Sequence, residues 1–236
     1  MGRMTTDHTI TTTMTTDHDT QSLLRLMTWL SPAFPVGAFA YSGGLEAAAR
    51  DCVVTDAGEL RQWLETLLGN GSIWNDAVLL AEAWHAHEDQ PRLAAVAELA
   101  TALAGSAERH LEITAQGGAF LEAAAAWPHP VLAMLDQTTP YCVAVGAIAA
   151  AHGVPLERTL TAYLHALASQ HVSSGIRLSV LGQRQGVTML AALEPDILDV
   201  AACASRSTLD DLGSAAMMAD LMAIRHETIH TRLFRS

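Results

Sequence analysis

The sequence predicts a soluble, all-α protein built as a single compact multi-helix domain, and three observations support this. Half of the 236 residues are hydrophobic, but only 5% are aromatic, and Ala and Leu dominate the apolar content. Ala and Leu favour helices, whereas the β-branched runs that favour strands are scarce. Apolar residues also recur with a helical period. A chain of this length buries roughly 70 per cent of its unfolded surface, so a full core needs no disulfide or metal.

The first 20 residues differ from the rest. Met4-Thr-Thr-Asp-His8 recurs as Met14-Thr-Thr-Asp-His18, with a Thr-rich spacer between the two copies. Such low-complexity sequence has almost nothing to bury, so we expect residues 1–20 to form a disordered leader. The two Asp-His pairs could contact a metal, but a solvated leader is the favoured interpretation.

The helical period begins at Gln21 and is clearest in a helix expected over 59–68. One face of this helix is apolar: Leu60, Trp63, Leu64, Leu67 and Leu68. Asp56 with Glu59 resembles a capping box, and Gly69 suits the end of the helix. Pro155 suits the first turn of another helix, whose apolar positions are Leu160, Tyr163, Leu164 and Leu167. Further helices are expected near 74–87, 91–104, 106–126, 141–151, 173–184 and 186–203.

Charge and cysteine usage exclude several classes of function. All 13 basic residues are Arg, and 25 acidic residues give a formal charge of −12, which repels a phosphate backbone. Cys52, Cys142 and Cys203 lie far apart without a C-x-x-C pair, as in a reducing compartment. We expect no nucleic acid partner. The sequence also lacks an apolar signal segment and a membrane-spanning run, so we expect a cytoplasmic protein without a membrane partner.

Near its end the chain reads His226-Glu227-Thr228-Ile229-His230, an H-E-x-x-H pattern. On a helix, two histidines four residues apart can bind one zinc ion while the Glu activates its water. Only six residues follow the motif, and none of them is a third ligand. No phosphate loop or nucleophile elbow is present either. A binding protein is therefore favoured, and a zinc-dependent hydrolase is the alternative.

The least helix-like stretch is "LSPAFPVGAFAYSGGLE", residues 30–46. Ordering a loop rich in Gly and Pro costs backbone entropy, so its aromatic residues should either pack a corner of the core or present a surface to a partner. Composition leaves these two interpretations equally open.

This stretch strongly resembles the N-terminal signature of the UreF family of urease accessory proteins. Three further blocks resemble the family in order: "LRQWLETLL" with Asp76 after it, "YCVAVGAIAAAHGVPLERTLTAYLHALASQHVSSGIRLSVLGQRQG", and "DDLGSAAMMADLMAIRHETIHTRLFRS". Together they span from about residue 23 to the end. In the family's C-terminal motif the His-Glu pair recurs, while the position of His230 commonly holds an aromatic residue, so the resemblance implies that H-E-x-x-H arises here by a local substitution.

The resemblance implies a UreF-like helical domain over 21–205 and a C-terminal helical docking tail over 206–236. It implies a non-enzymatic, homodimeric scaffold or chaperone in nickel insertion into urease. Its partners would be UreD (also called UreH), the GTPase UreG and the urease apoprotein. The protein would regulate GTP-dependent nickel delivery, with nickel handled by the complex and no cofactor bound tightly by this chain.

The candidate partner-binding residues lie in the loop, the central block and the tail. They are Phe34, Pro35, Gly37, Phe39, Tyr41, Ser42, Glu46, Arg177, Arg225, His226, Glu227, Leu233 and Phe234. At least one loop aromatic should be an interface anchor. Arg177 suits an acidic partner or an intramolecular salt bridge equally well. The tail would dock onto UreD/UreH or, alternatively, pack onto its own domain. Catalytic and metal-binding residues are not expected.

Overall fold

The computed structural model describes residues 7–236, with side chains from His18 onward. This part of the chain contains helices and no strands, which confirms the all-α prediction. The α-helices are α1 (Asp7–Trp29), α2 (Leu45–Arg50), α3 (Ala57–Asn70), α4 (Ser72–His85), α5 (Gln90–Ala102), α6 (Ala107–Ala124), α7 (Tyr141–Ala151), α8 (Leu156–Arg177), α9 (Gln183–Ala204) and α10 (Met217–His226). Three short 3-10 helices join them: η1 (Ala38–Ala40), η2 (Pro130–Met134) and η3 (Leu209–Asp211).

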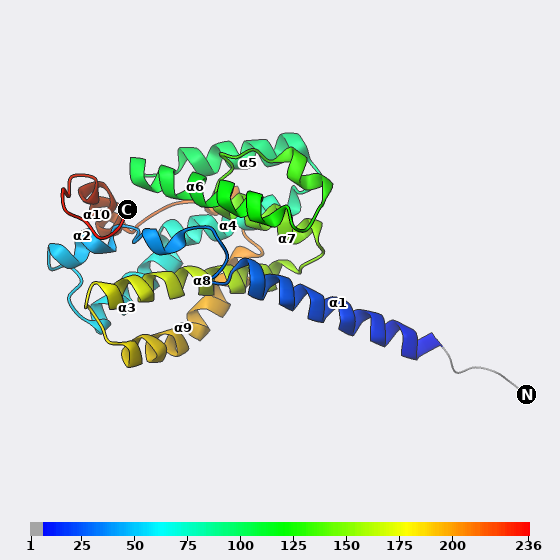
Figure 1. Cartoon of the computed structure of the whole chain (residues 1–236), viewed down its shortest axis with the longest axis horizontal. Helices are drawn as coiled ribbons and strands as arrows, with labels where there is room; N and C mark the ends of the chain where they lie inside the picture. The colour runs from blue at the N-terminus through cyan, green and yellow to red at the C-terminus, as the bar shows by residue number, and fades with distance from the viewer. Residues whose placement is uncertain (1–6) are drawn as a thin grey trace, which may run out of the picture.

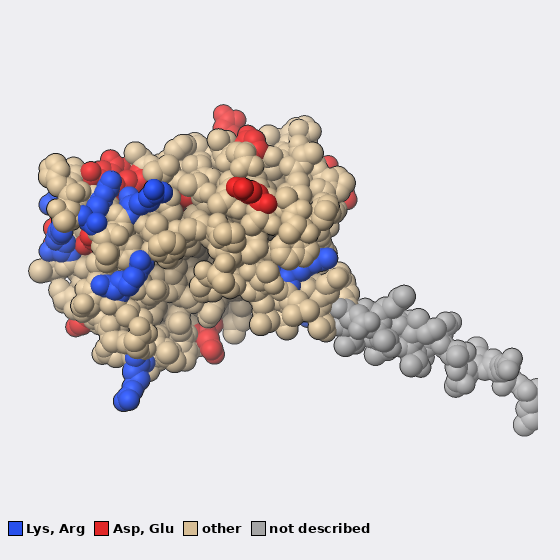
Figure 2. Space-filling model, viewed as in Figure 1, with Lys and Arg blue, Asp and Glu red and all other residues tan. Residues whose placement is uncertain are grey.

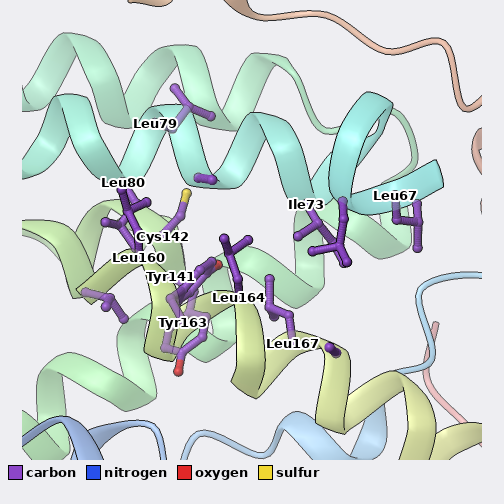
Figure 3. Packing of buried hydrophobic residues seen from close by; sticks show 14 of the residues in the cluster. Leu67, Ile73, Leu79, Leu80, Tyr141, Cys142, Leu160, Tyr163, Leu164 and Leu167 are labelled. Atoms are coloured by element: carbon purple, nitrogen blue, oxygen red, sulfur yellow. The ribbon is translucent and has the colours of Figure 1, made fainter. Parts of the chain in front are cut away.

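Helix α7 is the centre of the core. All residues from Tyr141 to Ala150 are buried, so this helix is apolar all round. It packs most extensively against α4, and also against α6 and α8. A Cβ on Gly146 would lie 2.3 Å from the carbonyl oxygen of Leu80, so the glycine allows the backbones of α4 and α7 to approach closely. Figure 3 shows side chains of α4, α7 and α8 meeting in this core.

The predicted helix at 59–68 lies within α3. The Asp56 side chain accepts a hydrogen bond from the Glu59 backbone N–H at 2.9 Å. The Glu59 carboxylate in turn accepts from the backbone N–H of Thr55 at 2.7 Å. The cap therefore forms as expected at Asp56, although Glu59 reaches back one residue further than in a standard capping box. The five apolar positions of this helix are all buried.

The prediction of a separate helix near 173–184 is wrong. Helix α8 runs without interruption to Arg177, and the next helix begins only at Gln183. Ser179 between them has a φ of 61°, a left-handed conformation that ends the helix. The apolar pattern continued across this turn because Leu178 and Val180 also pack against the core. Periodicity alone could not locate the break.

Helix α1 extends back to Asp7 and thus includes residues 7–20 of the expected disordered leader. Residues 1–6 lie outside the described residues, as do the side chains of the first Asp-His pair and of Asp17. From His18 onward the helix contacts the domain. Arg158 pairs with Asp19 at 2.9 Å, and Trp29 is almost fully buried. No helix begins or ends at residue 20, where we expect the leader to meet the helical domain.

The two ends of the described chain lie at opposite ends of the molecule (Figure 1). Helix α1 extends away from the body at one end, whereas α10 and the C-terminal residues lie beside α2 at the other. In the described part of the chain, no helix combines the length and the apolar character that a membrane span requires.

Candidate functional site

Three segments that are far apart in the sequence meet beside α10. They are the loop of residues 30–46, the first turns of α6, and the C-terminal segment of residues 227–236. The meeting point, called here the C-terminal junction, is formed by Ser42, Glu46, Glu108, His226, Phe234 and Ser236. The junction thus joins the first and the last of the four stretches quoted for the family resemblance.

His226 lies at the centre of the junction with no exposed surface. Its Nδ1 is 2.6 Å from Oε2 of Glu108, and its Nε2 is 3.1 Å from Oε2 of Glu46. Glu108 also accepts a hydrogen bond from Arg232. Both ring nitrogens therefore face carboxylates, so His226 ties α10 to α2 and α6 and is not free to bind a metal.

Glu46 fixes the C-terminal segment. Its Oε1 accepts from the backbone N–H of Leu233 at 2.8 Å, and its Oε2 accepts from that of Phe234 at 2.9 Å. Burial raises the pKa of Glu46, but the hydrogen bonds from Leu233, His226 and Phe234 outweigh burial and hold the pKa below its ordinary value. Glu46 is therefore an ionised acceptor inside the domain, neither a simple helix cap nor a surface charge.

Main-chain contacts extend this attachment to the end of the sequence. The backbone N–H of Ser42 donates to the carbonyl oxygen of Ser236 at 2.6 Å, and Arg235 N–H donates to Ala40 at 2.7 Å. The ring of Phe234 is buried beneath the guanidinium of Arg177, whose carbon lies 4.1 Å from the ring centroid. Arg177 thus makes a cation–π contact, and it forms no salt bridge within the described residues, which leaves contact with an acidic partner as a prediction.

Gly44 allows α2 and α10 to approach closely. Its φ is +82°, and a Cβ there would lie 2.7 Å from the backbone nitrogen of Ala223. Neighbouring Gly43 has a φ of +59° and faces Nε2 of His171. Side chains are disfavoured at both positions, by conformation and by space. The Ser-Gly-Gly sequence therefore serves the packing of α10.

Behind the junction lies a cavity of about 190 Å³, whose mainly apolar lining also includes polar groups of α4, α6 and α8. Arg109 bonds Asp76 at 2.5 Å and lies 3.3 Å from Glu112. Burial lowers the pKa of Arg109, but the two carboxylates outweigh it and raise the pKa above its ordinary value. The hydroxyl of Tyr163 donates to Asp76 at 3.2 Å. These groups satisfy one another and form a structural ion-pair network.

The loop aromatics divide between core and surface. Tyr41 is buried, and Phe34 packs partly buried against Phe120, with ring centroids 5.6 Å apart. Phe39 is 74% exposed on η1, which makes it the loop aromatic available to a partner. Pro35 and Gly37 are exposed beside it. The core interpretation is therefore confirmed for Tyr41 and Phe34, whereas a partner contact through Phe39 stays a prediction.

The H-E-x-x-H motif is not on one helix. Helix α10 ends at His226, and His230 is exposed in the irregular segment that follows. Glu227 instead accepts the Ala107 backbone N–H at 2.8 Å, capping the start of α6. From His18 onward, no group of three or more His, Cys, Asp or Glu side chains is arranged to hold a metal ion. This geometry does not support the zinc alternative.

The remaining candidate residues in the tail are Arg225 and Leu233, and both are exposed, whereas Phe234 is buried. Arg225 is exposed and pairs with Asp51 at 3.3 Å, and Leu233 is 60% exposed beside the buried Phe234. Figure 2 shows most of the basic side chains visible from this side at the end that carries α2 and α10. The tail therefore packs onto its own domain while presenting an exposed side.

Sequence reasoning missed Glu108 and Ser236. Glu108 follows the cap residue Ser106 and reads as an ordinary acidic residue in a first helical turn. Its partner His226 is 118 positions away, and no local spacing connects them. Only the fold reveals the junction.

The comparisons with known proteins agree with the quoted blocks. The UreF family model matches residues 54–194. A urease accessory protein UreF of Agrobacterium fabrum is 59% identical over 223 residues, which cover 94% of this chain and all of that protein. UreF proteins of Rhizobium johnstonii and Mesorhizobium japonicum are 59% and 56% identical, with the same coverage. The chain belongs to the UreF family of urease accessory proteins.

Proposed function

We propose that this protein is a non-enzymatic scaffold for insertion of nickel into urease, bridging UreD/UreH and the GTPase UreG and regulating GTP-dependent delivery of the metal. The relatives are named as urease accessory proteins over essentially the whole chain, which supports the process. At the junction His226 is engaged by carboxylates, which supports binding in preference to catalysis. In this proposal nickel is cargo of the complex and the protein works in the cytoplasm.

The observation that carries the proposal is a set of exposed apolar side chains around the junction. This set, called the terminal face, comprises Phe39, Met217, Met218, Leu221, Ile224 and Leu233. Each of them is between 49% and 79% exposed. Exposed apolar residues gathered at one end of a protein mark an interaction site. Aromatic and Met side chains suit adaptable binding surfaces, so the Met residues of α10 serve docking without being nickel ligands.

We assign the terminal face to UreD/UreH. Arg225 follows Ile224 in α10, and Arg232 and Arg235 lie close to Leu233 in the sequence, so the partner surface should be apolar with an acidic rim. The cation–π pair of Arg177 and Phe234 lies at the same end of the molecule. Because the C-terminal segment already packs on its own domain, docking needs little further ordering of this segment, which favours affinity.

The homodimer contact is assigned to a second surface. An open apolar groove of about 910 Å³ lies between α1, α8 and α9, with Leu23, Met27 and Leu198 exposed in its wall. Leu198→Asp should then convert a dimer to a monomer in sedimentation experiments without altering the helical signal. A Leu198→Asp protein that remains dimeric would show that the homodimer contact lies on another surface.

The test of the proposed function is complementation. A urease-producing bacterium that lacks its own UreF should recover urease activity and nickel content when this full-length chain is supplied. UreD/UreH and UreG should co-purify with it. Recovery of neither activity nor nickel, with the chain folded and abundant, would overturn the proposal.

A further inference from the structure

We propose that the cavity behind the C-terminal junction is a binding site for one alkylammonium group, supplied either by a Lys side chain of a protein partner or by a free primary amine. The cavity has a volume of about 190 Å³. A cavity of about 150 Å³ accepts a molecule as large as benzene, whereas drug-sized ligands occupy pockets of about 300 Å³ or more. The size of the cavity therefore fits one short side chain or a small molecule, and excludes a nucleotide.

His171 provides a hydrogen-bond acceptor inside this cavity. The residue lines the cavity from α8, and only 8% of it is exposed. Its Nδ1 lies 2.9 Å from the carbonyl oxygen of Leu167, so Nδ1 carries the ring proton. Burial lowers the pKa of His171, so the ring is neutral at neutral pH and Nε2 keeps a lone pair. Among the described residues, none donates a hydrogen bond to this nitrogen.

Gly43 leaves Nε2 of His171 accessible from the cavity. A Cβ at Gly43 would lie only 3.0 Å from this nitrogen, and Gly43 itself belongs to the lining. The position without a side chain therefore gives a ligand access to the lone pair. An acceptor that is buried without a donor is unfavourable, so a donor that enters the cavity gains a hydrogen bond there.

The charge of the lining favours a donor that is a cation. Within the described chain, Arg109 brings the one guanidinium of the lining, against four acidic residues: Asp76, Glu108, Glu112 and Asp220. Arg232 pairs with Glu108, which leaves three acidic residues for one guanidinium. Arg109 is shared between Asp76, at 2.5 Å, and Glu112, at 3.3 Å. Hydrogen bonds from a charged donor are stronger than those from a neutral one, so a cationic donor fits best.

The apolar part of the lining suits the stem of such a group. Leu67, Ile73 and Leu167, which Figure 3 labels, are buried and line the cavity. Leu103 and Gly105 also line it and are exposed, so the cavity opens to solvent beside the end of α5. Long amphipathic side chains bury their methylene stems along apolar surface. An alkylammonium group that enters beside α5 therefore places its stem on the apolar wall and its charge near the buried acceptors.

A metal ion fits the same lining less well. From His18 onward, no three His, Cys, Asp or Glu side chains are placed to hold one. Arg109 also puts a positive charge into the site. The geometry therefore favours an ammonium group, which needs acceptors but no coordination shell.

Titration of n-butylammonium into the full-length, ¹⁵N-labelled protein tests the proposal, because this ion reproduces the Lys side chain. We expect amide chemical-shift changes at residues 43–44, 105–113 and 167–171, which surround the cavity. n-Butanol has the same stem without the charge and should bind at least about tenfold more weakly, as expected when a charge-assisted hydrogen bond is lost. Nα-Acetyl-lysine methylamide identifies the source. Its binding indicates a protein side chain, whereas its exclusion while n-butylammonium binds indicates a free amine.

Two variants and one control locate the site. His171→Leu removes the acceptor, and Ala104→Phe fills the opening beside α5 without altering a polar side chain. Each should weaken n-butylammonium binding by at least about tenfold while the helical content stays that of the wild type. Glu122→Gln alters an exposed acidic residue elsewhere on α6 and should bind as the wild type does. Equal binding of n-butanol, shift changes that avoid the cavity, or undiminished binding by either folded variant overturns the proposal, whether or not the protein acts in urease maturation.

Discussion

Replacing Glu46 with Ala should detach the C-terminal segment and destabilise the whole domain. The substitution removes the acceptor of two backbone N–H groups and leaves His226 with one carboxylate partner. Leaving buried hydrogen-bond donors without their acceptor typically costs about 1 to 3 kcal/mol for each donor. The loss of stability cannot exceed the free energy of opening the C-terminal segment, because opening returns its N–H groups to water. Opening in turn exposes Phe234, whose burial contributes about 1.5 to 3 kcal/mol.

Opening therefore limits the loss to about 1.5 to 3 kcal/mol, which corresponds to about 3 to 12 °C in Tm for a chain of this size. Thermal and urea unfolding, followed by circular dichroism, measure the change. Glu65→Ala is the matched control, because Glu65 is a partly exposed helical residue whose one ion pair among the described residues is with Arg61. The Tm of this variant should stay close to that of the wild type. A wild-type Tm in Glu46→Ala, with residues 233–236 still protected from exchange, would refute the role given to the junction.

Three further predictions follow from particular contacts. Gly44→Ala should lower stability by about 2 kcal/mol or more, since a methyl group there meets the backbone of α10 at a positive φ; a Tm within a degree of the wild type would show that the α2–α10 contact is not tight. His230→Tyr should leave Tm and urease activation unchanged, because the ring is exposed and has no structural role; loss of activation together with a bound zinc ion would revive the metal alternative. Folding lowers the pKa of Glu46, so its contribution to stability is present above its ordinary pKa of 4.5 and is lost as pH falls through the lowered folded value. The difference in unfolding free energy between wild type and Glu46→Gln should therefore become smaller in acid. A difference that becomes larger in acid would contradict this direction.

The helical fold could be predicted from local patterns wherever one face of a helix is buried. The apolar positions of α3, with the cap at Asp56, are visible in the sequence because helix periodicity and capping are local effects. The break at Ser179 was missed because apolar residues continue on both sides of the turn. The extent of α1 was also missed, since a Thr-rich stretch has weak helix propensity and little apolar content.

The functional site could be predicted only in part. The family resemblance drew attention to the loop and the tail, but it could not show that Glu46 and His226, 180 positions apart, form one bond. Composition likewise could not distinguish exposed Phe39 from buried Tyr41. Their burial depends on which part of the loop contacts α8 in the folded protein, and that part is Tyr41. Long-range pairing of buried polar groups leaves no local pattern, so Glu108 became visible only in the folded chain.

The assignment of the terminal face to UreD/UreH is tested most directly by one exposed substitution on α10. Leu221 is 54% exposed, so Leu221→Asp should preserve the Tm and helical content of the protein. Co-purification with UreD/UreH and urease activation should both fall by at least about tenfold, as expected when a charge enters an apolar interface. Val187→Asp, at a 70% exposed position on α9, is the control and should bind as the wild type does. Wild-type binding by the stably folded Leu221→Asp protein would contradict the assignment.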